Sequence, residues 1–167
     1  MSEHGLTLID AIQMAMQAEK QAADLYHNAV SQTANPLGKR LFNQLAEFER
    51  HHYKKLEELA ASLQKQGKFI AYEDSPPFLA QSEVPVPEGA AAIPEANKMS
   101  MMQIIKMAQE AEVKAQNRYN DLATQTTNPV GRKMFEQLAQ EEEAHYRLLR
   151  DVYWNLNDRS IWAWPKE

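Results

Sequence analysis

The sequence predicts an all-α protein: a four-helix bundle made of two repeated helical hairpins joined by a long crossover. Three observations lead to this fold class. Apolar residues recur at helical spacing in four long stretches, the first half of the chain is repeated in the second, and a proline-rich segment separates the halves. A chain of 167 residues can bury a substantial core, so we expect residues 1–167 to form a single domain.

The repeat is visible in a direct alignment. Residues 18–53 align with residues 111–146 at a constant offset of 93, without a gap and with sixteen identities in thirty-six positions. Both copies contain N-P-x-G, at residues 35–38 and 128–131. With only two copies and so long a period, the pattern is not that of a solenoid. The chain is therefore an internal duplication.

The first half predicts a helical hairpin with its turn near residues 34–35. Asn35 followed by Pro36 supplies an N-cap and a favourable first-turn residue for the second helix. The apolar or small stripe of the first helix consists of Ile12, Ala15, Ala22, Tyr26 and Ala29. The stripe of the second helix consists of Leu41, Leu45, Leu56, Leu59 and Leu63.

The second half predicts a matching hairpin with its turn near residue 127. The stripe of the third helix consists of Ile105, Ala108, Ala115 and Leu122, and that of the fourth of Met134, Leu138, Leu149 and Val152. Between the hairpins, residues 67–98 hold five of the eight prolines, including S-P-P and V-P-V-P, which cannot continue a helix. We interpret this segment as a crossover that runs the length of the bundle.

Composition excludes several functional classes. The formal net charge of −5 provides no electrostatic basis for binding nucleic acid or an anionic membrane surface. The absence of cysteine excludes disulfides, thiolate metal sites and iron–sulfur clusters. The N-terminus lacks signal-peptide features, and no apolar run approaches the ~20 residues that cross a bilayer. We therefore expect a cytoplasmic protein with no nucleic-acid or membrane partner.

Six ionisable side chains interrupt the apolar stripes. In each hairpin, the two stripe glutamates stand thirty residues apart and about equally far from the turn, roughly 22 Å at ~1.5 Å per residue. All six groups are therefore expected to meet at mid-bundle. An unpartnered buried carboxylate is costly, so a cluster of four requires a partner. The six residues are Glu19, Glu49, His52, Glu112, Glu142 and His145.

This set of groups predicts a two-metal site. Four carboxylates balance the charge of two divalent cations, and two neutral imidazoles complete the ligand sets. Oxygen-rich coordination with one nitrogen per metal suits iron or manganese better than a closed tetrahedral zinc site. We expect two iron ions, with manganese or zinc as substitutes. Without metal, crowding of the carboxylates is expected to raise some of their pKa values.

The ligand pattern resembles that of the ferritin-like di-iron carboxylate family, and most of all its rubrerythrin branch. In this pattern, two helices carry one glutamate each, and the other two carry a Glu-x-x-His motif each. The resemblance covers all four helices. It implies that Glu49 and Glu142 bridge the two irons. It further implies that the two remaining ligand pairs, Glu19 with His52 and Glu112 with His145, complete the two ligand sets.

The resemblance also assigns a role to two tyrosines. Tyr26 and Tyr119 lie seven residues after the first- and third-helix glutamates and resemble tyrosines that hydrogen-bond the metal ligands. Rubrerythrins typically carry an extra glutamate shortly after the third-helix ligand, which receives an iron that leaves its histidine. Here that stretch reads V-K-A-Q, with Ala115 at the third position. We therefore expect both histidines to remain ligands in both oxidation states, in a more symmetric centre.

The leading functional hypothesis is a non-haem di-iron oxidoreductase that reacts with O₂ or hydrogen peroxide. Typical rubrerythrins also carry a rubredoxin domain with four cysteines, and this sequence has none, so the resemblance implies a separate electron-donor protein. The alternative is an iron-binding or storage protein with ferroxidase activity. A third hypothesis is a structural bundle with a buried polar network.

Two other segments stand out in the sequence. The run E-E-E at 141–143 is interpreted as a solvated charge run, in which only Glu142 has the spacing of a ligand. The C-terminal tail, residues 158–167, contains S-I-W-A-W-P, which either packs on its own bundle or buries apolar surface in a dimer. We expect a homodimer.

Overall fold

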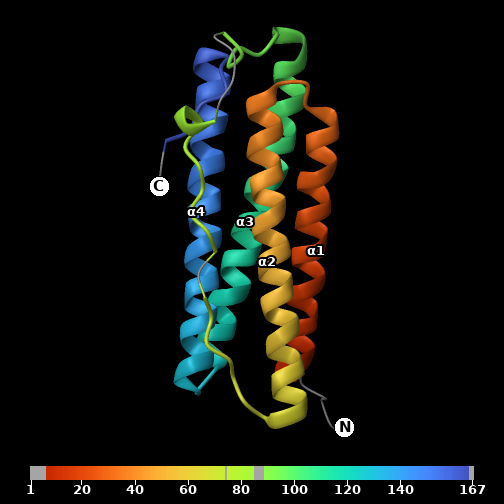
Figure 1. Ribbon diagram of the computed structural model, residues 1–167, viewed down its shortest axis with the longest axis vertical. Helices are drawn as coiled ribbons and strands as arrows, with labels where there is room; N and C mark the ends of the chain where they lie inside the picture. The colour runs from red at the N-terminus through yellow and green to blue at the C-terminus, as the bar shows by residue number, and fades with distance from the viewer. Residues whose placement is uncertain (1–6, 74, 85–88, 166–167) are drawn as a thin grey trace.

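Four long helices form the protein, as Figure 1 shows for the computed structural model, which describes residues 7–73, 75–84 and 89–165. The helices are α1 (Leu8–Gln32), α2 (Pro36–Gln66), α3 (Glu95–Gln125) and α4 (Pro129–Arg159), and a short 3-10 helix, η1, spans Gln81–Glu83. Within the described residues, extended pairing is limited to an isolated bridge between Ala92 and Ile161. The predicted all-α class is confirmed.

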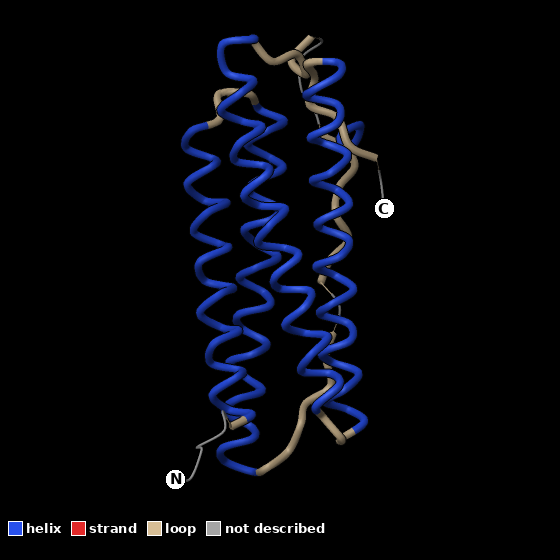
Figure 2. The backbone as a smooth tube through the Cα atoms, turned by 180° about the vertical axis from the view of Figure 1, so that it is seen from behind, coloured by secondary structure: helices blue, strands red, loops and turns tan. Residues whose placement is uncertain are grey.

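The helices pair as the repeat predicts, α1 with α2 and α3 with α4. Helices α1 and α4 run in one direction along the bundle and α2 and α3 in the other (Figure 1). The connector between the hairpins runs along the length of the bundle (Figure 1 and Figure 2), and its described residues bond to both α2 and α4. Helix α3 begins at Glu95, so the last four residues of the predicted crossover 67–98 are helical. Pro94 stands just before the helix, where its fixed φ and missing N–H are tolerated.

The repeated N-P-x-G motif builds the same helix start twice. The side-chain oxygen of Asn35 accepts a hydrogen bond from the backbone N–H of Leu37 at 2.8 Å, and that of Asn128 accepts one from Val130 at 2.9 Å. In both helices proline occupies the first turn, where no intrahelical donor is needed. The predicted turns are thus explained by local capping.

The glycine of each motif allows an aromatic ring from outside the repeat to approach the helix start. A Cβ atom on Gly38 would lie 2.5 Å from Cγ2 of Thr33 and 2.7 Å from Cζ2 of Trp162, and one on Gly131 would lie 2.3 Å from Cδ1 of Phe69. Trp162 belongs to the C-terminal tail and Phe69 to the connector. Glycine is needed at both positions because any side chain would collide with the ring.

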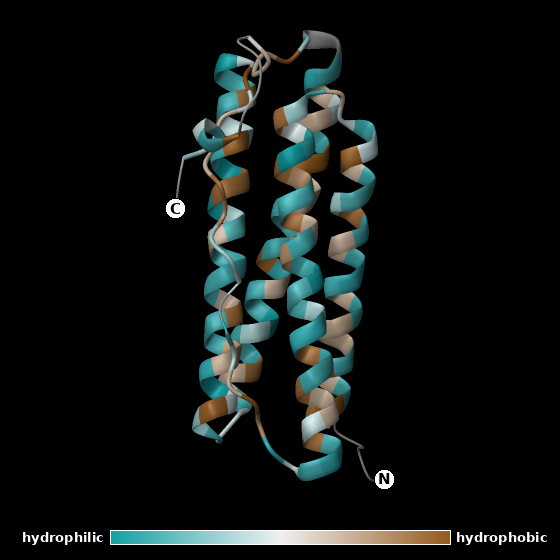
Figure 3. Ribbon diagram, in the orientation of Figure 1, coloured by the Kyte–Doolittle hydropathy of each residue, from teal (hydrophilic) through white to brown (hydrophobic). Residues whose placement is uncertain are grey.

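The hydrophobic core is divided into two clusters along the bundle axis. One cluster includes Tyr26, Phe42 and Leu149, and the other includes Leu56 and Phe135. The outward faces of the helices are mainly hydrophilic (Figure 3). None of the described helices is long and apolar enough to span a membrane. A polar layer therefore separates two apolar halves of one core.

The C-terminal tail, described up to residue 165, packs on its own bundle. Trp162 is fully buried, and the indole N–H of Trp164 donates a hydrogen bond to the carbonyl of Leu79 at 2.9 Å. Of the two alternatives for the tail, the structure shows packing on its own bundle for these two tryptophans. The physical reason is the slot above Gly38, which the Trp162 ring fills within the same chain. Trp154 remains 55% exposed, and the homodimer stays a prediction.

Replacing Gly38 by alanine tests this packing. The new methyl group would collide with the buried Trp162 ring, so we expect a loss of about 1–3 kcal/mol in the free energy of unfolding. This loss exceeds the gain of roughly 1 kcal/mol that alanine brings to a helix interior. Gly131→Ala is the matched comparison and should cost less, because Phe69 is only partly buried and can move. Urea unfolding of both variants measures the difference; a Gly38→Ala protein as stable as the wild type would contradict this account.

Candidate metal centre

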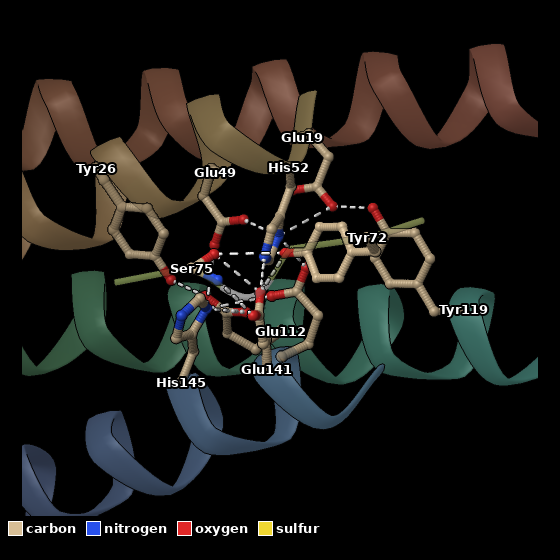
Figure 4. Close-up of polar contacts among 11 residues, drawn as sticks. Glu19, Tyr26, Glu49, His52, Tyr72, Ser75, Glu112, Tyr119, Glu141 and His145 are labelled. Carbon is tan, nitrogen blue, oxygen red and sulfur yellow. Dashed lines mark hydrogen bonds and ion pairs between the residues drawn. The ribbon is translucent and has the colours of Figure 1, made fainter. Parts of the chain in front are cut away.

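The polar layer between the two core clusters contains all six predicted ligands. They come from all four helices, and those that Figure 4 labels point toward one another. Each is between 0 and 4% exposed, although each is ionisable. The glutamates are equally far from their turns along the sequence, and they lie at the same level of the bundle, as expected. The six residues are Glu19 on α1, Glu49 and His52 on α2, Glu112 on α3, and Glu142 and His145 on α4.

The six side chains form two overlapping groups. Within each group, one ligand atom from every residue lies within 4.8 Å of the others. Glu49 and Glu142 belong to both groups, and each group contains one histidine. Two shared carboxylates and one imidazole on each side could hold two adjacent metal ions. The groups are Glu19, Glu49, His52 and Glu142, and Glu49, Glu112, Glu142 and His145.

Both imidazoles present Nδ1 to the centre. Nδ1 of His52 lies 3.0 Å from Oε1 of Glu142, and Nδ1 of His145 lies 3.2 Å from Oε2 of the same carboxylate. One oxygen of Glu49, Oε2, is buried and accepts no hydrogen bond of good geometry, and Nδ1 of His52 lies 3.3 Å from it. A buried acceptor of this kind normally has a partner, and a metal cation would supply one. The donor set and this incompletely satisfied oxygen therefore fit a pair of hard divalent cations.

The two predicted tyrosines connect the hairpins. The hydroxyl of Tyr26 on α1 donates to Glu112 on α3, and that of Tyr119 on α3 donates to Glu19 on α1. Each tyrosine thus holds the glutamate of the other helix rather than that of its own. Burial, followed by the neighbouring carboxylates, raises the pKa of both phenols well above the usual value. Both hydroxyls consequently keep the proton that they donate.

The carboxylates divide into two electrostatic classes. Burial and the surrounding carboxylates raise the pKa of Glu49 well above its usual value and that of Glu142 to about 8. Burial also disfavours the charged form of Glu19 and Glu112, but His52 and His145 respectively outweigh it. The pKa of Glu19 is lowered to about 2, and that of Glu112 is also lowered. The shared carboxyl groups thus favour the protonated form.

The histidines complete this charge balance. Burial alone would lower their pKa values, but the carboxylates around them outweigh burial, and the pKa of His52 and that of His145 are raised well above the usual value. In the metal-free centre, two imidazolium groups therefore lie beside the ionised Glu19 and Glu112. Divalent cations binding to the same groups must displace these protons, because metal ligands bind in their deprotonated forms.

One residue that sequence analysis assigned to solvent belongs to this centre. Oε2 of Glu141 lies 2.6 Å from Nε2 of His52, and the side chain is only 18% exposed. The interpretation of 141–143 as a solvated run is therefore wrong for Glu141. Its other partners, Tyr72 and Ser75, lie in the connector, whose course does not follow from the helical pattern. The sequence did contain a signal for this role of Glu141. It precedes Glu142 by one residue, which places it about 100° around the helix and thus at the edge of the inner face.

A cavity of about 340 Å³ opens between α1 and α3 and reaches the centre. Its lining includes the carboxylate-bearing residues Glu19, Glu49 and Glu112. Small residues at repeat-related positions leave this space open: Ala18, Ala22, Ala111 and Ala115. The centre is thus reached from the α1–α3 side, while the connector covers the α2–α4 side.

Comparison with known proteins agrees with this geometry. The sequence matches the family profile described as Rubrerythrin over residues 3–83 and 97–165. The chain belongs to the rubrerythrin family. The predicted ferritin-like bundle is confirmed, and no rubredoxin domain lies within these 167 residues, which contain no cysteine. Rubrerythrin-family proteins typically hold a pair of iron ions, and the two groups of buried residues fit such a pair.

A solved structure shares this fold. It is described as "Hypothetical Protein Pfu-1136390-001 From Pyrococcus furiosus", and it aligns with a TM-score of 0.71 at 24% sequence identity over 96% of each chain. At this identity the likeness concerns the fold alone. A search of curated proteins gives no match.

The metal-free rubrerythrin-family centre should lose stability as pH rises. Glu142 changes its pKa from 4.5 to about 8 on folding, so its stabilising contribution is present below pH 4.5 and is lost as pH rises through about 8. The histidines, whose pKa values are also raised, act in the same direction. We expect the thermal midpoint of metal-free protein to fall as pH is raised from about 4.5 to about 8.

The metal-loaded protein provides the control. Its ligands are held deprotonated by the metal, so its thermal midpoint should not show the same fall over this range. Below pH 4.5 the sign reverses, because Glu19 and Glu141 have pKa values of about 2 and their stabilisation is lost as pH falls toward that value. A metal-free midpoint that rises between pH 4.5 and pH 8 would show that this charge assignment is incorrect.

The shared position of Glu49 gives a second prediction. Glu49→Gln should weaken both metal positions, whereas Glu19→Gln should weaken mainly the position that contains His52. Anomalous scattering from Co²⁺-soaked crystals measures the occupancy of each position. Glu47→Gln is the control, because its side chain is 72% exposed and pairs with Arg50. Loss of a single position in Glu49→Gln would contradict its bridging role.

Proposed function

We propose that this rubrerythrin-family chain is a di-iron oxidoreductase that reduces hydrogen peroxide or O₂ with electrons from a separate donor protein. The observation that carries the proposal is the pair of overlapping ligand groups sharing Glu49 and Glu142 at the end of an open cavity. Two adjacent metals with shared carboxylates can act together on one small oxidant. The electron-donor protein, the homodimer and the cytoplasmic location remain predictions.

The ligand groups assign the residues to two positions. Glu19 and His52 would hold one iron, Glu112 and His145 the other, and the two shared glutamates would bridge them. When bound, two ferrous ions would supply the two electrons that, together with two protons, reduce hydrogen peroxide to two water molecules or O₂ to hydrogen peroxide. The donor protein then returns these two electrons.

The remaining side chains orient the ligands and control access. Tyr26 and Tyr119 hold Glu112 and Glu19 by hydrogen bonds across the hairpins, which limits how far these carboxylates can rotate. The alanine-lined cavity admits a small oxidant from the α1–α3 side. On the opposite side, the connector residues Tyr72 and Ser75 cover Glu141 and limit solvent access to the centre.

Iron uptake with ferroxidase activity is the second candidate, and one observation favours it. The cavity is lined by Glu19, Glu49 and Glu112, which would attract a ferrous ion, although Lys114 and Arg118 also line it. In that case iron is the substrate, and no peroxide turnover is needed. The two candidates therefore differ in what is consumed.

Anaerobic loading with ferrous iron, followed by separate challenges with O₂ and peroxide, distinguishes the candidates. We expect repeated turnover of peroxide in the presence of a chemical reductant. The consumption of this reductant measures the turnover. Stoichiometric oxidation with iron retained in the protein would support uptake instead. No binding of iron by the folded chain would leave only a structural polar network.

The cavity can be tested in the same experiment. Ala115→Leu should narrow it and slow oxidation of bound ferrous iron by peroxide several-fold, without lowering the iron content. Ala61→Leu, at a half-buried position of α2 outside the cavity, is the matched control. Unchanged oxidation rates in the Ala115→Leu protein would show that the oxidant enters elsewhere.

A further inference from the structure

The two histidines of the centre have different surroundings, although the sequence repeat relates them. Nε2 of His52 faces Glu141 at 2.6 Å, and a carboxylate only accepts, so this ring nitrogen donates the hydrogen bond. The repeat-related position of Glu141 is Phe48. The Phe48 ring lies edge-on to the ring of His145, with centroids 5.0 Å apart and an interplanar angle of 62°. His52 thus has a carboxylate acceptor beside it, whereas His145 has an aromatic ring at the equivalent position.

The connector holds Glu141 in place. Oε2 accepts a hydrogen bond from the hydroxyl of Tyr72 at 2.7 Å and from the hydroxyl of Ser75 at 3.0 Å. Oε1 accepts one from the backbone N–H of Ser75 at 2.9 Å. With His52 included, four donors converge on a single carboxylate, which leaves it little freedom to turn away from the imidazole (Figure 4).

His145 has an apolar partner instead. Phe48 stacks on Phe78 of the connector, with ring centroids 5.6 Å apart and an interplanar angle of 12°. Within the described part of the chain, the polar contacts of His145 are made through Nδ1, on the side of the centre. The same connector therefore brings hydrogen-bond donors to the Glu141 carboxylate and an aromatic ring to the side chain that packs on His145.

This difference has a chemical consequence for metal binding. A carboxylate that accepts the remote N–H of an imidazole fixes the tautomer and ring orientation and makes the other nitrogen a stronger ligand. For His52, that other nitrogen is Nδ1, which faces the shared glutamates. An aromatic edge provides contact with His145 but no full negative charge.

We propose that Glu141 is a positioning residue that makes the two metal positions unequal, with the His52 position the tighter and the first to fill. The proposal rests on the two-metal centre proposed above and adds an order of filling to it. The His52 position would then keep its metal, while the metal beside His145 exchanges more readily.

A titration with Co²⁺ alone tests this order. The metal-free chain is titrated and followed by visible absorption and calorimetry, and crystals containing one equivalent are measured at the cobalt edge. We expect two separable binding steps and higher occupancy on the His52 side. Equal occupancy, or preferential filling of the His145 side, would overturn the proposal while leaving the two-metal centre intact. Failure of the folded chain to bind any Co²⁺ would instead overturn the centre itself.

The role of Glu141 is tested by substitution. Glu141→Gln keeps the size of the side chain but removes its charge, so the tighter step should weaken by about 10–100-fold and the weaker step should change little. Glu143→Gln is the matched control, because Glu143 lies two residues away, is 47% exposed and pairs with Arg147. It should leave both steps unchanged.

A second variant covers the case in which Glu141→Gln does not fold. Tyr72→Phe removes one of the donors that hold Glu141, without altering a charge, and should weaken the same step to a smaller degree. A general loss of stability would weaken both steps alike, whereas a positioning role reduces the ratio between them. An unchanged ratio in both variants, or in Tyr72→Phe alone if Glu141→Gln does not fold, would overturn the proposal.

Discussion

The burial of four carboxylates in the middle of an apolar bundle is the constraint on which the rest of the structure depends. Such a cluster is stable only if positive charge or protons accompany it. In the metal-free chain, the pKa shifts of the histidines and of the shared glutamates indicate that protons serve this purpose. In a metal-loaded chain, two divalent cations would replace them. The same groups thus couple stability, pH and metal content.

Duplication explains why the two halves of the bundle contribute the same set of ligands. The segments outside the repeat explain why the surroundings of these ligands differ. Each hairpin contributes one glutamate from its first helix, Glu-x-x-His from its second, and a tyrosine that bonds across to the other hairpin. The connector and the tail lie outside the repeat and do not resemble each other in sequence. They place Phe69 and Trp162 on equivalent helix starts, but they surround the two histidines differently.

The connector also divides the bundle into a closed and an open side. It runs between α2 and α4, where its polar and aromatic side chains contact Glu141 and Phe48, the residues that lie against the two histidines. On the α1–α3 side, alanines at repeat-related positions leave a cavity that ends at three of the carboxylates. The cavity to the carboxylates and the connector that covers Glu141 therefore lie on opposite sides of the bundle.

Helical periodicity and the repeat determined the four helices, their pairing and the six inward groups, because spacing along a helix translates directly into position on its surface. The turns followed from Asn35 and Asn128, since capping is local. The tertiary structure alone decided that Glu141 bonds His52, that Phe48 packs on His145 and that the tail folds back on its own bundle. These contacts involve the connector or the tail, whose course has no periodic pattern, so their partners depend on which groove the chain enters.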